Sequence, residues 1–167
     1  RVLHSGLCQA QFRRYFADLA SSEIPGHEYV GRVEEVGEGV ETLATGDAVM
    51  CYPFRPCGTC VVCRAGHSPV CPFKKQPGIN GGFGEYVAAQ ASNFLKIPED
   101  FVNKHGVLLL DVFGMMYRAM QPMSIHSDSI TAVVGILSYG LGAIEMAKKR
   151  GARVVAFDVS PYRREIG

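Results

Sequence analysis

Short β-like runs of apolar residues fill the first part of the chain, and turn-forming polar residues and glycines separate them. Residues 31–36, 48–52 and 85–88 each predict a short β-strand, and residues 1–3 resemble the middle of another. The separators include Gly, Asp and Thr, which favour turns. This pattern predicts a small, irregular β domain.

Longer apolar segments replace this pattern from about residue 99 onward. The expected elements are a helix over 107–120, a buried strand over 129–134, a helix over 141–150 that stops at Gly151, and a second buried strand over 153–157. Strand, glycine-rich turn, helix and strand make one βαβ unit. We therefore expect two domains, residues 1–98 and 99–167, and a mixed α and β fold.

Composition and charge exclude several partners. The 167 residues carry 17 basic and 16 acidic side chains, which gives no electrostatic basis for binding nucleic acid or an anionic membrane. No apolar run reaches the roughly 20 residues of a membrane span, and the N-terminus does not resemble a signal peptide. We expect neither a nucleic-acid nor a membrane partner.

Four of the six cysteines fall within fifteen residues, at the spacing Cys-x2-Cys-x2-Cys-x7-Cys. They are Cys57, Cys60, Cys63 and Cys71. Such spacing lets four thiolates close a tetrahedron around one zinc ion, and a site without an open position is structural. Free or disulfide-linked cysteines and an iron–sulfur cluster are alternatives. The metal-ligand spacing favours zinc and a reducing, cytoplasmic location over disulfides in a secreted protein.

A second candidate site begins at His27 and Glu28, which follow Pro25-Gly26. A single His beside a Glu is weak evidence, and a structural histidine is the simpler interpretation. The surrounding motifs change that interpretation.

The order and spacing of these motifs resemble those of the zinc-dependent medium-chain alcohol dehydrogenases. The matching stretches are residues 5–8 (SGLC), 25–28 (PGHE), 36–40 (VGEGV), 46–49 (GDAV), the four-cysteine lobe 57–71, 81–87 (GGFGEYV) and the βαβ unit that ends at Asp158. The resemblance implies a GroES-like irregular β domain over 1–98, followed by the start of a Rossmann α/β domain over 99–167.

The resemblance also assigns roles to individual residues. Cys8 and His27 match the first two ligands of a catalytic zinc ion, and Glu28 matches the adjacent carboxylate that can approach the metal. Asp111 matches the third protein ligand. An alternative role for Asp111 is a helix N-terminal acid, but its apolar surroundings argue for a metal or a basic partner, because a buried unpaired carboxylate is costly.

Three protein ligands would leave one zinc position open for an alcohol or carbonyl oxygen, and hydride would pass to or from a nicotinamide. The resemblance thus implies a zinc-dependent, NAD-linked oxidoreductase acting on a small alcohol or aldehyde, and a dimer or tetramer at full length. One alternative is a family-derived protein that keeps the structural zinc but has lost or changed its redox activity. Another is a zinc-ribbon interaction module.

The glycine-rich turn is the expected cofactor site. The family pattern Gly-x-Gly-x-x-Gly corresponds here to Gly135, Leu137 and Gly140, so a Leu replaces the glycine that lets the backbone approach a pyrophosphate. Asp158 ends the second strand, where an acid accepts hydrogen bonds from ribose and favours NAD over NADP. The alternative for Asp158 is an ordinary strand-end turn residue.

The chain departs from the family in two further respects: the residues that follow Cys8, and its length. Ala10 stands where the family has a hydroxyl that relays a proton, and Gln11 stands where it has Asp. Water or another side chain would have to carry that proton. Family chains are about twice as long, so we expect that the 167-residue chain alone does not catalyse hydride transfer.

Overall fold

The computed structural model describes residues 1–16, 23–75 and 78–167. The chain divides into two compact units, Arg1–Val107 and Leu108–Gly167. The domain division after residue 98 that the resemblance implies stays a prediction.

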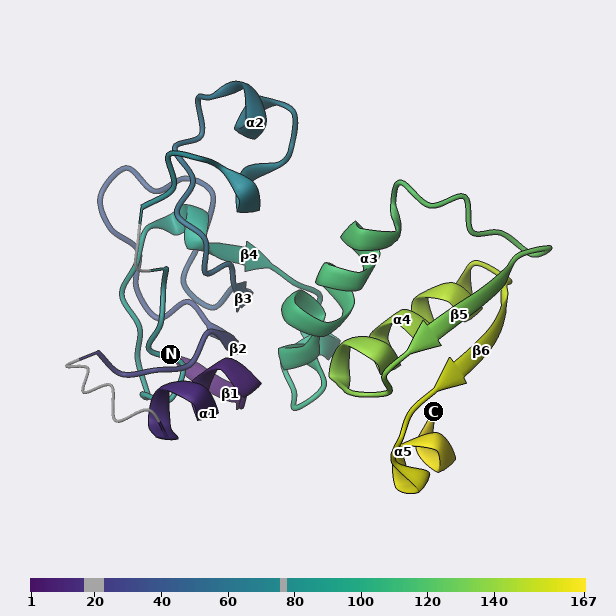
Figure 1. The fold of residues 1–167 in the computed structure, drawn as a ribbon. Coiled ribbons are helices and arrows are strands. Elements are labelled where there is room, and N and C mark those ends of the chain that lie inside the picture. The colour runs from purple at the N-terminus through teal and green to yellow at the C-terminus, as the bar shows by residue number, and fades with distance from the viewer. Residues whose placement is uncertain (17–22, 76–77) are drawn as a thin grey trace. The chain divides into compact units, whose positions relative to one another are not determined.

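The first unit is built on a four-stranded antiparallel sheet in the order β1-β2-β3-β4 (Figure 1). The strands are β1 (Val2–Gly6), β2 (Glu28–Arg32), β3 (Ala48–Cys51) and β4 (Phe94–Lys96). Strand β2 is central and buried, because it pairs with β1 on one side and β3 on the other. Its Tyr29 and Val30 form part of the core of this unit.

Short helices and turns complete the first unit. They are α1 (Gln9–Phe16), α2 (Val61–Arg64) and the 3₁₀ turns Ser68–Val70, Ala91–Asn93 and Glu99–Phe101. The predicted strand at 85–88 is wrong: these residues are irregular, although the N–H of Val2 donates to the carbonyl of Glu85 at 2.8 Å. A β-like run of residues is not sufficient for a strand, because a strand also needs a paired backbone ladder.

The second unit begins with helical turns of changing type. A 3₁₀ turn that starts in the first unit (Gly106–Leu108) leads into a π-helix (Leu109–Gly114) and then into α3 (Met115–Met120). The helix predicted over 107–120 is therefore helical throughout, but it is not one regular α-helix. This puts Asp111 in the π-helical turn.

The predicted βαβ unit is confirmed. Strands β5 (Ile130–Val134) and β6 (Arg153–Phe157) pair in parallel, and α4 (Ser138–Lys149) connects them. Helix α4 begins three residues before the predicted start, and α5 (Pro161–Ile166) follows β6 (Figure 1).

Helix α4 packs against the strand pair through a small apolar core that includes Val133, Ile136, Ile144 and Ala147. The helix ends as predicted at Gly151, whose φ is +83°. The N–H groups of Gly151 and Ala152 donate to the carbonyls of Lys148 and Ala147, the pattern of a Schellman motif.

The longest of the described helices, α4, has 12 residues. Within the described part of the chain, no helix combines the length and the apolarity that a bilayer span requires.

Candidate functional site

Specific side-chain contacts attach the four-cysteine lobe to the sheet. The buried Asn93 amide donates to the carbonyls of Tyr52 and Phe54, both at 2.8 Å, just after β3 ends. The hydroxyls of Tyr52 and Ser68 share a hydrogen bond at 2.6 Å. These contacts fix the chain both where it enters the lobe, at Tyr52 and Phe54, and near its end, at Ser68.

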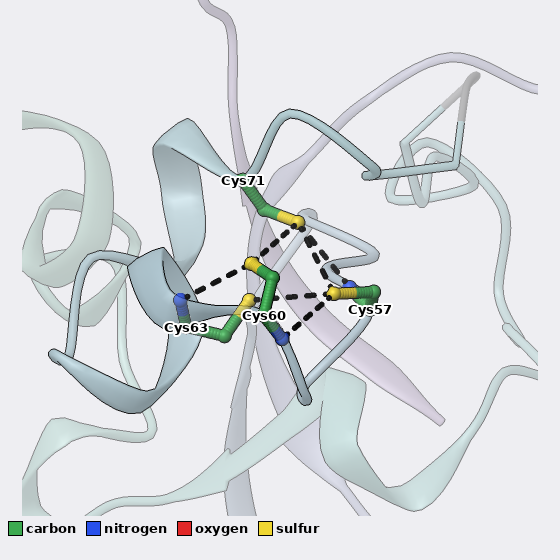
Figure 2. Close-up of side chains that lie close together, drawn as sticks. All are labelled: Cys57, Cys60, Cys63 and Cys71. Atoms are coloured by element: carbon green, nitrogen blue, oxygen red, sulfur yellow. Dashed lines mark hydrogen bonds between the residues drawn. The ribbon is translucent and has the colours of Figure 1, made fainter.

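The four cysteine side chains point toward one common centre (Figure 2). The Sγ atoms of Cys57 and Cys71 are 3.6 Å apart, those of Cys60 and Cys71 are 3.8 Å apart, and those of Cys57 and Cys63 are 3.9 Å apart. Each Cys-x2-Cys step is a tight turn in which a backbone N–H donates to the preceding sulfur, Cys60 N–H to Cys57 and Cys63 N–H to Cys60, both at 3.4 Å.

These distances fit one tetrahedral zinc ion. Zinc–sulfur bonds of about 2.3 Å put the sulfurs of a tetrahedron about 3.8 Å apart. A disulfide needs about 2.05 Å between its sulfurs, and none of the six cysteines, all of which lie in the described residues, forms a disulfide. Thiolates around several iron ions would have to stand farther apart. The disulfide alternative is therefore wrong, and a single metal ion fits better than a cluster.

The thiols of the lobe do not ionise alike. Backbone N–H groups of Thr59 and Cys60 lower the pKa of the Cys57 thiol to about 6. Desolvation raises the pKa of the Cys63 thiol to about 12. A bound dication would hold both as thiolates, so this donor set suits zinc.

Cys51 takes no part in this cluster. Its side chain is buried at the end of β3, and burial raises the pKa of its thiol to about 11. Cys51 is therefore a protonated core residue.

The second candidate site lies at the β1–β2 pair. Gly6 pairs with Glu28 in antiparallel register, so the chain two residues beyond Gly6 runs past His27. As a result, ligand atoms of Cys8, His27 and Glu28 lie within 4.8 Å of one another. Glu28 is only 8% exposed, whereas Cys8 and His27 are half-buried.

Gly26 sets the direction in which His27 enters β2. Its φ is +98°, and a Cβ there would lie 2.9 Å from the backbone nitrogen of Phe83. Only glycine meets both conditions without strain. The Pro25-Gly26 motif and the Gly81–Gly84 loop thus shape this site together.

Gln11 holds the His27 ring. Its Nε2 lies 2.9 Å from His27 Nδ1, and Gln11 stands three residues after Cys8 in α1. Rotation of the amide lets its oxygen accept from Nδ1–H, the tautomer that leaves Nε2 available to a metal ion. The sequence showed Gln11 only as a residue that replaces the family's Asp, whereas the structure shows that its uncharged amide contacts His27.

Asp111 lies in the second unit, half-buried in the π-helical turn. The hydroxyl of Tyr139 donates to its Oδ2 at 3.2 Å. The carboxylate thus has a polar partner in an otherwise apolar segment, and its role as a metal ligand stays a prediction.

The glycine-rich turn keeps two features of a nucleotide site. Gly135 has a φ of +96°, and its N–H donates to the carbonyl of Phe157 at 2.7 Å. A Cβ on Gly140 would overlap the carbonyl oxygen of Gly135, so the helix can approach the turn only with glycine at this position. The first and third glycines of the pattern therefore meet real geometric requirements.

Leu137 is the position that fits least well. It directly precedes α4, and its side chain is 51% exposed. It borders a surface hollow of about 490 Å³ together with Gly135, Asp158, Arg163 and Arg164. A pyrophosphate at the start of α4 would meet this apolar side chain.

Asp158 already has a structural task. Its side chain is 3% exposed, Oδ2 accepts from the Ile136 N–H at 2.7 Å, and Oδ1 accepts from the Ser160 N–H at 2.8 Å. These two N–H groups, with the Arg163 guanidinium at 3.5 Å, hold the pKa of Asp158 below its usual value. The contacts support the turn interpretation: Oδ1 faces both the Ser160 N–H and the Arg163 guanidinium, and Oδ2 keeps a lone pair for a further donor.

Sequence reasoning missed two contacts. The contact between Gln11 and His27 has a weak signal in the sequence: residues three apart near a helix start lie on one face, so Gln11 is expected beside Cys8, the first member of the same candidate site. The one between Tyr139 and Asp111 has no local signal, since the packing of α4 creates it.

Comparisons with known proteins agree on one family. The profile described as "Alcohol dehydrogenase GroES-like domain" matches residues 1–99. L-galactonate-5-dehydrogenase of Escherichia coli (strain K12) is 33% identical over 170 residues, which cover 99% of this chain and 49% of that protein. An alcohol dehydrogenase of Geobacillus stearothermophilus is 33% identical over 173 residues, 99% of this chain and 51% of that protein.

The solved structures give the same result. The cobalt- and zinc-bound thermostable alcohol dehydrogenase of Pyrobaculum aerophilum superposes with a TM-score of 0.87 at 28% identity, over 99% of this chain and 52% of that one. The chain thus spans about half the length of the relatives it matches. These matches confirm the predicted fold class, a GroES-like domain followed by the start of a Rossmann domain, and they do not favour a zinc-ribbon module.

Proposed function

This chain belongs to the zinc-dependent medium-chain alcohol dehydrogenases, and from that premise we propose that the whole protein transfers hydride between a small alcohol or aldehyde and NAD. The observation that carries the proposal is the convergence of Cys8, His27 and Glu28 at the β1–β2 pair, apart from the four-cysteine lobe.

Each donor of the proposed catalytic site has a distinct task. Cys8 supplies a thiolate, His27 supplies a ring nitrogen that Gln11 orients, and Asp111 supplies the third protein ligand. Thiolate, imidazole and carboxylate form an accepted ligand set for a zinc ion with one open position. Glu28 is the buried carboxylate beside that set.

Cys8, His27 and Asp111 would hold a zinc ion that would supply Lewis-acid polarisation of the substrate oxygen, and NAD would supply the hydride acceptor or donor. The role of the protein is to orient the reacting groups and to exclude water from them. Glu28 is buried at the start of β2, so the inner side of the site lies in the interior of the first unit. Ala10 has no hydroxyl to pass a proton, so water or another side chain performs that step.

In the second unit, the Gly135–Gly140 turn presents the first N–H groups of α4 to an anion. Asp158 directs the choice of cofactor to NAD, because its negative charge disfavours a 2′-phosphate. Leu137 weakens this cofactor site without removing the helix N-terminus.

The finer assignments follow from the same premise. We propose that the four-cysteine lobe holds a structural zinc and that the boundary between the two domains lies near residue 98 of the chain. The protein acts in the cytoplasm as a dimer or tetramer, without a nucleic-acid or membrane partner. Sedimentation analysis of the purified protein tests the oligomeric state.

Metal content tests the central proposal. We expect two zinc ions per chain by mass spectrometry, one in a His27→Ala variant, and two in a Cys51→Ala control that removes a buried thiol outside both sites. One zinc ion in the unsubstituted protein would contradict the proposal. NAD-linked oxidation of a panel of small alcohols by the whole protein then identifies the substrate class.

A further inference from the structure

A tyrosine of the glycine-rich turn contacts the proposed third metal ligand within the second unit. The hydroxyl of Tyr139 donates to Asp111 Oδ2 at 3.2 Å, although the two residues are 28 positions apart. Tyr139 directly precedes Gly140, in the first turn of α4. One side chain therefore joins the two regions that sequence analysis assigned to cofactor and metal.

Close packing fixes this contact in place. Gly142 stands on α4 three residues after Tyr139, and a Cβ there would lie 2.9 Å from the carbonyl oxygen of Val112. Glycine at this position lets α4 lie directly against the π-helical turn that carries Asp111. Because Val112 is buried next to Asp111, the backbone on the acceptor side is also held.

We propose that Tyr139 is a positioning residue for Asp111, a proposal that rests on the role of Asp111 given above. A carboxylate has two oxygens, and the Tyr139 hydroxyl occupies a lone pair of Oδ2. Oδ1 is then directed as the oxygen offered to the ion. Ligating side chains in metal sites are commonly held by such outer hydrogen bonds, and removing one lowers metal affinity about 10–100-fold.

The π-helical turn explains why Asp111 needs this support. A π-turn is wider than an α-turn and occurs mainly as single turns at functional sites. The Asp111 side chain projects from this turn in an apolar segment, so a hydrogen bond is needed to hold its carboxylate in one rotamer. The Tyr139 hydroxyl supplies that constraint.

The Tyr139→Phe substitution removes the hydroxyl and keeps the ring. We expect the affinity of the second zinc site to fall about 10–100-fold in competition with a chelator, while the four-cysteine site keeps its ion. In the cobalt(II)-loaded protein, the visible absorption bands of the second site should shift. Tyr162→Phe in α5, which changes an exposed tyrosine of the same unit, should alter neither readout.

A double-substitution cycle separates positioning from a general structural effect. Asp111→Cys keeps a zinc ligand but removes the carboxylate that Tyr139 holds, so Tyr139→Phe should have no further effect on affinity in that background. An effect that persists there would overturn the proposal.

Two other outcomes are equally decisive. If the unsubstituted protein binds two ions and Tyr139→Phe changes neither affinity nor spectrum, Tyr139 has no positioning role and the proposed function stands. If the unsubstituted protein binds only one ion, both proposals are refuted.

Discussion

Removal of zinc from the four-cysteine lobe should open that lobe and leave the rest of the first unit folded. The lobe, residues 57–71, has almost no hydrophobic core. Neither α2 nor the 3₁₀ turn Ser68–Val70 buries a residue, and Val61 and Val70 are at least 70% exposed. Cys71 is the buried side chain of the lobe, and it belongs to the proposed zinc site.

The magnitude follows from these observations. Ordering the backbone costs about 1–2 kcal/mol per residue, and each hydrogen bond returns only about 1 kcal/mol. Apolar burial adds little here. A structural zinc ion contributes about 10–16 kcal/mol in comparable small sites, so the metal is the largest single stabilising term in the lobe.

Trypsin measures this opening directly. Arg64 lies in α2 at the centre of the lobe, and cleavage after it gives one fragment that ends at Arg64 and one that begins at Ala65. We expect rapid cleavage after chelation or in a Cys63→Ala variant, and slow cleavage in the zinc-loaded protein. Arg64→Gln should remove the fragments, and His27→Ala should leave Arg64 protected because it affects only the other site. Equal protection of Arg64 with and without zinc would refute the reasoning.

Three further predictions concern the second unit. Gly140→Ala should destabilise it by about 2 kcal/mol, because the new Cβ overlaps the Gly135 carbonyl; thermal unfolding should show a fall of about 8–16 °C, whereas Gly37→Ala, which meets no atom within 4 Å, should change little. Leu137→Gly should tighten NAD binding in calorimetry, since it clears the approach to the turn, and unchanged affinity would show that Leu137 does not obstruct the cofactor. Because the pKa of Asp158 is lowered in the folded protein, its carboxylate stabilises the fold fully above the usual pKa of 3.8, and this stabilisation is lost as the pH falls below that value. In Asp158→Asn, circular dichroism should therefore show that the stability of this unit no longer falls with pH in that range.

Local patterns were sufficient for the βαβ unit and for the lobe, but not for β2, which spans Glu28–Arg32 whereas the predicted strand covered 31–36. Strand β6 was predicted with its observed bounds, and β5 and α4 were each predicted to within three residues of their ends. The spacing of Cys57, Cys60, Cys63 and Cys71 predicted that the four sulfurs gather at one point, because short turns join the two Cys-x2-Cys steps. In both cases the interacting residues are close in sequence, so the pattern itself records the interaction.

The strand at 85–88 and the regular helix over 107–120 failed for the opposite reason. A β-like run predicted a strand at 85–88, but strand formation depends on a distant backbone partner. The π-turn at Leu109–Gly114 has the same apolar composition as an α-helix, so composition could not distinguish them.

The sequence by itself determined which donors exist and in what order: six cysteines, the His27-Glu28 pair and two glycines of the turn. Only the tertiary structure decided which donors meet. The β1–β2 register brings Cys8 to His27, and the packing of α4 brings Tyr139 to Asp111. Contacts between distant segments depend on backbone pairing and close packing in three dimensions, and neither leaves a periodic trace in the chain.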